Sequence, residues 1–357
     1  MVGRVVVIGG GILGTMHALA ARQRGLEVTH LEREPEARGA SVRNFGLIWV
    51  SGRCPGNELA LALRARQLWG QVPGIRFRPA GSLTIASDEA ELALMKEASA
   101  LPDAGQRGFE LLDAAGVRER NPAVAGEIHG GLFCERDAIV EPRLVLPSLR
   151  ATLDGSGYEW LPGREVIDIK AGAVKDHTGA WHHGDLVVLC TGAATRFIDG
   201  LPARRVRLQM LQTAPFDGTL TTALADGDSL RYYPAFELPG RARLAPQDPV
   251  AAAARAQLLL VQRADGTLTI GDTHEYDQPF AFDVTSEPYE HLLGRARALL
   301  GGPLPPVRRR WAGVYSEVVG TPALYHRSDV APGVVLVTGP GGRGMTCAPA
   351  IAEETFA

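Results

Sequence analysis

Two glycine-rich turns, one near each end of the chain, have the residue types and spacing best suited to bind a phosphorylated ligand. The first turn, Gly9-Gly10-Gly11-Ile12-Leu13-Gly14, fits G-x-G-x-x-G and follows the apolar run 5–8. A helix-like segment, a strand-like run over 26–31 and then Glu32 complete the unit. A strand–turn–helix–strand unit that ends in a carboxylate is typical of an adenine dinucleotide site.

Each residue of this first unit has an expected task. We expect Gly9 to allow the tight turn, Gly11 to let the backbone approach a pyrophosphate, and Gly14 to let helix and strand pack closely. Amides at the helix N-terminus would bind the phosphates. Glu32 would accept hydrogen bonds from a ribose diol, and its charge disfavours the 2′-phosphate of NADP. This unit alone leaves both FAD and NAD open.

The second turn, 339–344, favours FAD. It follows the apolar run 334–337 and precedes a final helix-like segment. NAD has no need of a second turn of this kind. A flavin does, because its ring system lies far from its adenine and its N1–C2=O edge becomes anionic on reduction. A helix N-terminus aimed at that edge supplies N–H donors and a favourable dipole.

Composition narrows the class of protein. A length of 357 residues favours two structural lobes, and 45% hydrophobic with 22% charged residues is typical of a globular protein. A net charge of −3 gives no broad basic field for nucleic acid. The run Arg308-Arg309-Arg310 is expected on a solvated strand edge or in ion pairs. Adjacent His182 and His183 face opposite sides of a strand, so no metal site is expected there.

The cysteines and the apolar runs indicate the cellular compartment in which the protein is expected. Cys54, Cys134, Cys190 and Cys347 form no C-x-x-C pair, so we expect free thiols in a reducing cytosol and neither a zinc site nor a redox dithiol. A strand that begins so close to Met1 leaves no room for a signal peptide, and no apolar run is long enough to span a bilayer. These observations predict a cytoplasmic protein.

The remaining pattern predicts an α/β fold with a Rossmann-like FAD-binding domain and an inserted mixed or antiparallel sheet. Parallel-type strands occur at the start, over 185–190 and over 334–337, and antiparallel-looking segments lie between them. We expect an FAD-binding domain of 1–50, 140–200 and 320–357, and a substrate domain of 51–139 and 201–319. Further expected elements are helices over 15–24, 59–69, 88–100 capped by Ser87, 286–300 and one opened by Pro142, a surface segment at 251–254, and a hairpin over 258–271.

Several segments together resemble the D-amino acid oxidase family of flavoproteins, to which glycine and sarcosine oxidases belong. The resemblance rests on 5–32, 39–46, 187–192, Val206-Arg207-Leu208-Gln209, Trp311-Ala312-Gly313 and 336–349. It implies FAD, a mixed-sheet substrate domain and oxidation of a C–N bond. The run Ala40 to Trp49 looks most like a bacterial clade proposed to oxidise aminophosphonates related to 2-aminoethylphosphonate.

Two departures from the family pattern bear on chemistry. Relatives that tether the flavin do so through a His in the loop matching 39–46 or a Cys soon after the W-A-G segment. Here the loop holds Arg43 and Asn44, and no Cys lies between Cys190 and Cys347, so non-covalent FAD is expected. Tyr315 stands where amino-acid oxidases of the family carry an Arg that clamps the substrate carboxylate. Either the substrate lacks an α-carboxylate or another Arg replaces the clamp.

Residues expected at the cofactor lie in both turns, in the loop 39–46, which we call the flavin loop, and at the end of the central strand over 185–190. They are Gly9, Gly11, Ile12, Leu13, Gly14, Glu32, Arg33, Ala40, Ser41, Arg43, Asn44, Phe45, Gly46, Val166, Thr191, Gly192, Gly339, Gly342, Arg343, Gly344, Met345 and Thr346. The candidate catalytic residues are Arg43, Arg343, His274 and Tyr315. We expect Arg43, Arg343 and His274 to bind a substrate anion, and Tyr233, Tyr315 and Trp49 to wall the pocket. For each of these residues the alternative to a role in binding is a structural one, either packing in the core or holding the turns together.

The expected reaction follows from the cofactor. A neutral small amine transfers hydride to flavin N5, the resulting imine hydrolyses to an aldehyde, and O₂ or another acceptor reoxidises the flavin. The expected substrate is a 2-aminoethylphosphonate-like compound, with or without an N-alkyl group. The alternatives are glycine, sarcosine or another small amino acid, or a flavin protein without catalysis. Oxidase or dehydrogenase action and the oligomeric state stay open.

Overall fold

Short apolar strands from distant parts of the chain form a six-stranded sheet in the computed structural model, which describes residues 3–194, 200–276 and 278–357. Their order is β18 (His326–Ala331), β19 (Val334–Thr338), β12 (Leu186–Leu189), β1 (Arg4–Ile8), β2 (Glu27–Leu31) and β8 (Tyr158–Leu161). All neighbours pair in parallel except β18 and β19. Val5, Val6 and Val7 of β1 are fully buried, as expected for a central strand covered on both faces.

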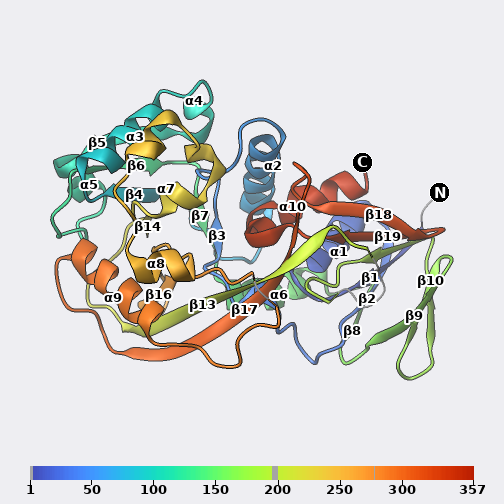
Figure 1. The fold of residues 1–357 in the computed structure, drawn as a ribbon. Coiled ribbons are helices and arrows are strands. Elements are labelled where there is room, and N and C mark those ends of the chain that lie inside the picture. The colour runs from blue at the N-terminus through green and yellow to red at the C-terminus, as the bar shows by residue number, and fades with distance from the viewer. Residues whose placement is uncertain (1–2, 195–199, 277) are drawn as a thin grey trace.

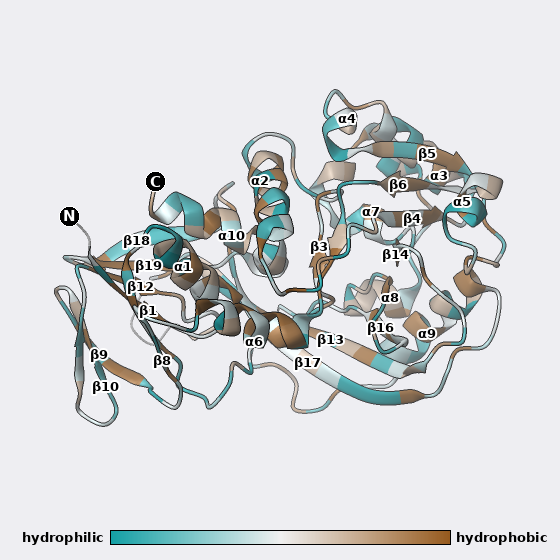
Figure 2. Cartoon of the chain, turned by 180° about the vertical axis from the view of Figure 1, so that it is seen from behind, coloured by the Kyte–Doolittle hydropathy of each residue, from teal (hydrophilic) through white to brown (hydrophobic). Residues whose placement is uncertain are grey.

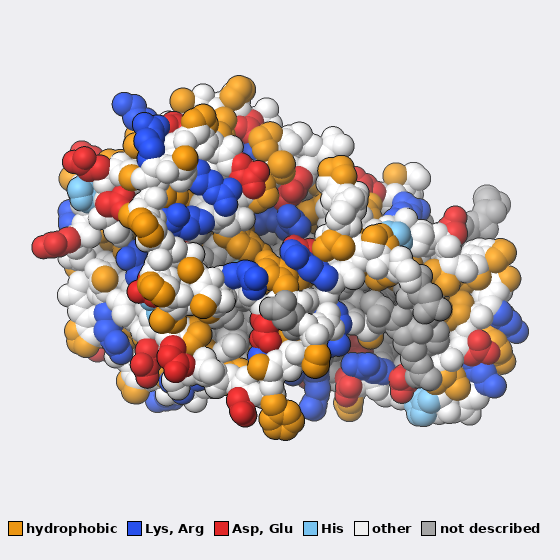
Figure 3. All heavy atoms as spheres, in the orientation of Figure 1, with side chains coloured by type: hydrophobic (Ala, Val, Ile, Leu, Met, Phe, Trp, Pro, Cys, Tyr) orange, Lys and Arg blue, Asp and Glu red, His pale blue; other side chains and the backbone are white. Residues whose placement is uncertain are grey.

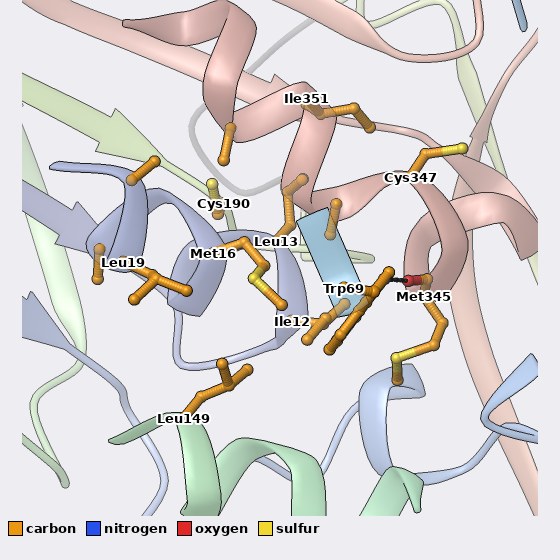
Figure 4. Close-up of a cluster of buried hydrophobic side chains, with 14 of the residues drawn as sticks. Ile12, Leu13, Met16, Leu19, Trp69, Leu149, Cys190, Met345, Cys347 and Ile351 are labelled. Carbon is orange, nitrogen blue, oxygen red and sulfur yellow. Dashed lines mark hydrogen bonds between the residues drawn. The ribbon is translucent and has the colours of Figure 1, made fainter. Parts of the chain in front are cut away.

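Helices cover one face of this sheet and a small sheet covers the other (Figure 1). The helices are α1 (Ile12–Gln23), α2 (Asn57–Gln71), α6 (Pro142–Leu153) and α10 (Gly344–Thr355). The small sheet comprises β9 (Val166–Lys170), β10 (Ala173–Asp176) and β11 (Trp181–His183). In the helical layer, the indole N–H of buried Trp69 donates to the carbonyl oxygen of Met345 at 3.0 Å (Figure 4). This bond fixes the first turn of α10 against α2.

A mixed eight-stranded sheet forms the other lobe, and its long strands β13 and β17 extend towards the first lobe (Figure 1). Its order is β17 (Val307–Val318), β13 (Ala203–Pro215), β16 (Thr267–Gly271), β15 (Leu259–Gln262), β14 (Ala223–Ala225), β4 (Ser82–Ala86), β6 (Gly130–Cys134) and β5 (Phe109–Asp113). Only β14 and β4 pair in parallel. A two-stranded ladder, β3 (Leu47–Ile48) with β7 (Ala138–Ile139), completes the described strands.

Two apolar clusters cover the faces of the eight-stranded sheet. One packs α9 against the sheet through Leu292, Ala296 and Leu299, and the other includes Phe45 and Trp49 from the flavin loop region. The second cluster therefore joins the sheet to the site. The helices of this lobe are α3 (Glu89–Ser99), α4 (Ala104–Arg107), α5 (Ala114–Arg120), α7 (Ser229–Tyr232), α8 (Pro249–Ala254) and α9 (Glu287–Leu300). Short 3₁₀ turns are η1 (Ala40–Val42), η2 (Pro234–Phe236), η3 (Pro239–Arg243) and η4 (Gly341–Arg343).

The fold confirms the expected α/β class with a Rossmann-like unit and a mixed sheet, and most expected elements are present. The expected hairpin is β15–β16, and the three arginines lie on the exposed edge strand β17, the teal stretch in Figure 2. One detail was wrong: Asp88, not Ser87, caps α3, because its carboxylate accepts from the amide of Glu91 at 2.8 Å. The surface segment at 251–254 lies in α8, with Ala252 and Ala253 exposed and Ala251 buried in the α9 cluster.

The division into a discontinuous FAD-binding domain and a substrate domain stays a prediction. Strands of the six-stranded sheet come from 4–31, 158–189 and 326–338, and those of the eight-stranded sheet from 82–134 and 203–318. All four cysteines are free thiols. Within the described ranges, no helix has the length and apolar character needed to cross a membrane.

Candidate active site

Both glycine-rich turns open into one cavity of about 1150 Å³. Its walls come from the C-terminal ends of β1, β2 and β12, the flavin loop, and the turn that precedes α10. Its other end is lined by residues of the mixed sheet and α7, among them Tyr232, Asp272 and Tyr315. Arg53, Arg204, Arg205 and Arg343 also line it. Figure 3 shows one face of the molecule, on which basic side chains gather around a hollow in the middle.

The first turn is built by close backbone approach. Gly9 has φ +105°, and a Cβ at Gly14 would lie 1.9 Å from the Gly9 carbonyl oxygen. Both positions therefore require glycine. Glu32 accepts from the amide of Gly10 at 2.6 Å and from that of Glu34 at 3.0 Å. Glu32 thus holds the turn as well as lining the cavity.

His30, which was not predicted from the sequence, also supports this turn. It is fully buried in β2, and its Nε2 lies 3.0 Å from the Gly9 carbonyl oxygen. Burial lowers the pKa of His30 to about 4, so the ring is neutral at neutral pH. A carbonyl oxygen only accepts, so Nε2 carries the proton and donates it to Gly9. The signal available in the sequence was the alternation of the strand, which places His30 on the same face as the apolar Val28.

Hydrogen bonds within the flavin loop and to neighbouring segments fix its position in the site. The Ser41 hydroxyl accepts from the amide of Ile12 at 2.9 Å and so caps α1. The side-chain amide of Asn44 donates to the carbonyl oxygen of Ala40 at 2.8 Å, which holds the loop in a tight turn. Arg43 lines the cavity and donates to the carbonyl oxygen of Ala312 at 3.0 Å. This loop is therefore pinned both to α1 and to β17.

The second turn brings the mixed sheet to the end of α10. A Cβ at Gly342 would lie 3.6 Å from the hydroxyl oxygen of Tyr315. Tyr315 is 9% exposed, and burial raises its pKa well above the usual value. Tyr315 can therefore donate a hydrogen bond but stays uncharged, so it is not a substitute for a clamping Arg.

Beyond Tyr315 the cavity wall is aromatic. His274 stacks on Tyr232 with ring centroids 4.2 Å apart, and Trp49 lies 5.9 Å from Tyr233. His274 is 2% exposed and its Nδ1 lies 3.1 Å from the carbonyl oxygen of Arg255. The expected wall residues Tyr233, Tyr315 and Trp49 all line the cavity, as does His274.

A cationic corner of the cavity contains Arg53, a residue that was not predicted from the sequence. Arg53 is 4% exposed and its guanidinium lies 3.3 Å from Oε1 of Glu58. The Nε of Arg343 donates to the same oxygen at 3.1 Å. One carboxylate thus faces two guanidinium groups, and Arg53 Nε has no hydrogen-bond partner among the described residues. Arg343 also lies 3.9 Å from Glu317, which pairs with Arg204. Three guanidinium groups against two carboxylates leave a net positive charge at this part of the cavity wall.

Most residues expected at the cofactor line this cavity, but three do not. Gly14 contributes only close packing. Gly46 has φ +68°, and a Cβ there would lie 2.0 Å from the carbonyl oxygen of Val140, so it fits the loop onto β7. Thr346 is buried and accepts from the amide of Trp49 at 2.9 Å. Gly14 therefore has the packing role expected of it, and Gly46 and Thr346 contact the protein rather than line the cavity.

The residues present fit FAD. The N-termini of α1 and α10 both border the cavity; Ser41 takes the Ile12 amide of α1, and α10 has no side-chain cap from its preceding residue. Glu32 lies at the first turn, and Trp49, whose buried indole N–H has no partner among the described residues, lines the same cavity. One continuous space therefore joins a pyrophosphate-type site to a second helix N-terminus, which a long dinucleotide can span.

Comparison with known proteins agrees with this arrangement. An opine oxidase subunit of Rhizobium meliloti is 24% identical over 182 residues, 46% of this chain, and the chain spans about half (49%) of that relative's length. D-amino-acid oxidase of Streptomyces coelicolor is 29% identical over 246 residues, 67% of this chain and 68% of that protein.

Among solved structures, glycine oxidase from Bacillus cereus superposes with a TM-score of 0.79 at 19% identity, covering 99% of this chain and 93% of that one. The likeness is one of fold. The family model described as DAO, FAD dependent oxidoreductase, matches residues 4–357. The resemblance and the expected cofactor are thereby confirmed, and the chain belongs to the DAO family of FAD-dependent oxidoreductases.

Proposed function

We propose that this protein oxidises the C–N bond of a small amine that also carries an anionic group, and that an aminophosphonate is its substrate. The observation that carries the proposal is the pair of opposite charges at the aromatic end of the cavity. Arg53 and Arg343 supply the positive side, and the buried carboxylate of Asp272 supplies the negative side. A zwitterionic amine complements both.

Tyr233 lies near both charges. The guanidinium of Arg53 is 5.7 Å from its ring centroid. Burial raises the pKa of Tyr233, the charge of Asp272 raises it further, and the charge of Arg53 opposes the rise. A single small molecule that contacts both Arg53 and Asp272 would therefore lie close to Tyr233.

The composition of the cationic corner favours a phosphonate over a carboxylate. Tyr315 occupies the position at which the family resemblance places a clamping Arg. Arg53 and Arg343 instead present two guanidinium groups that already share one carboxylate, Glu58. A doubly charged oxyanion with three oxygens can engage both groups at once, which a carboxylate does less completely. The run Ala40 to Trp49, which resembles the aminophosphonate clade, supports the same choice.

Bound FAD would accept a hydride from the carbon next to the substrate nitrogen. The chain's own residues orient that carbon. The arginines fix the anion, Asp272 faces the nitrogen, and the stacked rings of Tyr232 and His274 exclude water. We further propose that the FAD is held non-covalently and that O₂ is the electron acceptor.

A small amino acid such as glycine or sarcosine is the second candidate. Its ammonium and carboxylate carry the same two signs of charge, and D-amino-acid oxidase is among the relatives of this chain. Arg53 or Arg343 would then serve as the relocated clamp.

Purification and anaerobic titration test the proposal. We expect a yellow protein that loses all its FAD on acid precipitation, and whose flavin is bleached by small amines under anaerobic conditions, with hydrogen peroxide formed in air. Colour retained in the precipitate would contradict non-covalent binding. Rapid bleaching without peroxide would contradict O₂ as the acceptor. No bleaching by a broad amine panel would contradict amine oxidation and favour a flavin protein without catalysis.

A further inference from the structure

Asp272 is a buried carboxylate at the cavity wall that has no Arg or Lys partner in the described part of the chain. It follows β16 directly and is 5% exposed. Its backbone is held by paired hydrogen bonds with Gln257, at 2.8 and 3.1 Å. Among the described residues no Arg or Lys lies within ion-pair distance of it, and its Oδ1 makes no hydrogen bond, with the side chain of Gln257 beside it. A buried carboxylate in this state needs either a cation or a proton.

Among the residues that the structure describes, His274 is the one basic side chain within ion-pair distance of Asp272, and its tautomer can be assigned. Nδ1 lies 3.1 Å from the carbonyl oxygen of Arg255, which only accepts, so Nδ1 carries a proton. In the neutral ring Nε2 then has a lone pair. Nε2 lies 3.8 Å from Oδ2 of Asp272. The two groups therefore direct a lone pair and a negative charge towards each other, an arrangement that one added proton would stabilise.

The groups packed around this pair do not supply that proton. Tyr232 and Tyr233 come from α7 and its end, Tyr276 from the segment after β16, and Tyr315 from β17. Burial raises the pKa of each phenol, and the charge of Asp272 adds to the rise for Tyr232, Tyr233 and Tyr315. These phenols stay protonated and neutral. The guanidinium of Arg255 lies over the ring of Tyr276, at 5.0 Å from its centroid.

We propose that His274, paired with Asp272, accepts the proton that the substrate ammonium must lose before its C–N bond is oxidised. An N–H bond of the ammonium breaks and an Nε2–H bond forms. The electron pair stays on the substrate nitrogen, and the imidazolium is stabilised by Asp272 while Nδ1–H stays on the Arg255 carbonyl. This role rests on the proposed amine oxidation and adds to it a proton acceptor.

The pH dependence of anaerobic flavin bleaching tests the role. An ordinary alkylammonium has a pKa of about 10.4, so at pH 7.5 only about one molecule in 10³ is neutral. We expect His274→Gln and Asp272→Asn to slow bleaching by an aminophosphonate at least ten-fold at pH 7.5 and to approach the wild-type rate near pH 10. A merely structural role would slow bleaching equally at every pH and would contradict the proposal. Asp228→Asn, outside the cavity, should leave the profile unchanged.

The protonation state of a bound analogue gives a readout that does not depend on turnover. 2-Amino-2-methylpropylphosphonate has no hydrogen on the carbon that bears nitrogen, so it binds without being oxidised there. The ¹⁵N resonance of the labelled analogue distinguishes a neutral amine from an ammonium. The proposal predicts a bound neutral amine in the wild type at pH 7.5 and a bound ammonium in each variant, because only the wild type offers the proton an acceptor.

The outcomes separate the two proposals. The same protonation state of the bound analogue in wild type and variants, or unchanged pH profiles in both variants, would overturn the role of the pair while leaving amine oxidation intact. A wild-type flavin that no amine bleaches would overturn the proposed function itself. If Asp272→Asn does not bind FAD, both measurements are made with His274→Gln alone.

Discussion

Replacing Glu58 by Gln probes the cationic corner of the cavity most selectively. The change removes the one carboxylate shared by Arg53 and Arg343, whose nitrogens lie 3.3 and 3.1 Å from Oε1. Side-chain exposure is 5% for Arg53, 14% for Glu58 and 24% for Arg343. Arg343 would still have Glu317, whose Oε1 lies 3.9 Å from its Nη1, whereas Arg53 would face the cavity without a carboxylate partner among the described residues.

The expected loss of stability follows from this burial. Removing one partner of a fully buried ion pair costs about 3–5 kcal/mol. The Gln amide oxygen still accepts one hydrogen bond and Arg343 is partly hydrated, so we expect about 2 kcal/mol. At roughly 2.1 cal/mol/K of unfolding entropy per residue, a chain of 357 residues loses about 3 °C in Tm.

The same substitution should strengthen anion binding, which distinguishes a ligand site from a structural ion pair. Methylphosphonate no longer competes with Glu58, so we expect it to bind the variant holoenzyme about ten-fold more tightly, equivalent to about 1.4 kcal/mol. Calorimetric scans with and without methylphosphonate measure both quantities. Glu353→Gln, which breaks the 2.7 Å pair with Arg64 away from the cavity, is the matched control. A lower Tm without tighter methylphosphonate binding would refute the anion site.

Two further predictions concern the first turn and the pH dependence of stability. Gly11→Val should yield folded protein without FAD, whereas Gly14→Val should yield little folded protein because its side chain meets backbone; visible absorbance and circular dichroism distinguish the two. Glu32→Ala should weaken FAD binding without abolishing it. Full retention of FAD by both Val variants would contradict the placement of the cofactor at this turn. Burial raises the pKa of Glu91 from 4.5 to about 7, so its stabilising contribution is complete below pH 4.5 and is lost as pH rises through about 7. Glu91→Gln should flatten the pH dependence of the unfolding free energy over this interval, and an unchanged slope would contradict the assignment.

The cofactor half of the site was readable from the sequence because its determinants are local. Gly9, Gly14 and Glu32 act within one strand–turn–helix–strand unit, and the second turn acts within another. Their spacing alone fixes which amides are exposed at each helix N-terminus. Gly46 shows the limit: its need for glycine comes from Val140, a partner nearly a hundred residues away, not from the cofactor.

The substrate half depends on contacts between distant segments, which no spacing reveals. Arg53 and Arg343 meet because α2 packs against α10 and places Glu58 between them. Asp272 looked like an ordinary strand-end residue, and only the pairing of β15 with β16 and the packing of α7 enclose it. The chemistry of an isolated Asp or Arg is uninformative until tertiary packing removes its water.

The direct test of aminophosphonate oxidation is to compare two substrates that differ only in their anionic group. Anaerobic mixing of the FAD-loaded protein with 2-aminoethylphosphonate or with β-alanine measures first-turnover flavin bleaching, with glycine, sarcosine and D-alanine as further carboxylates. The two-guanidinium corner predicts bleaching at least ten-fold faster, at equal subsaturating concentration, with the phosphonate than with β-alanine. Faster bleaching by any of the carboxylates would contradict the phosphonate assignment and the anion-binding role of Arg53 and Arg343.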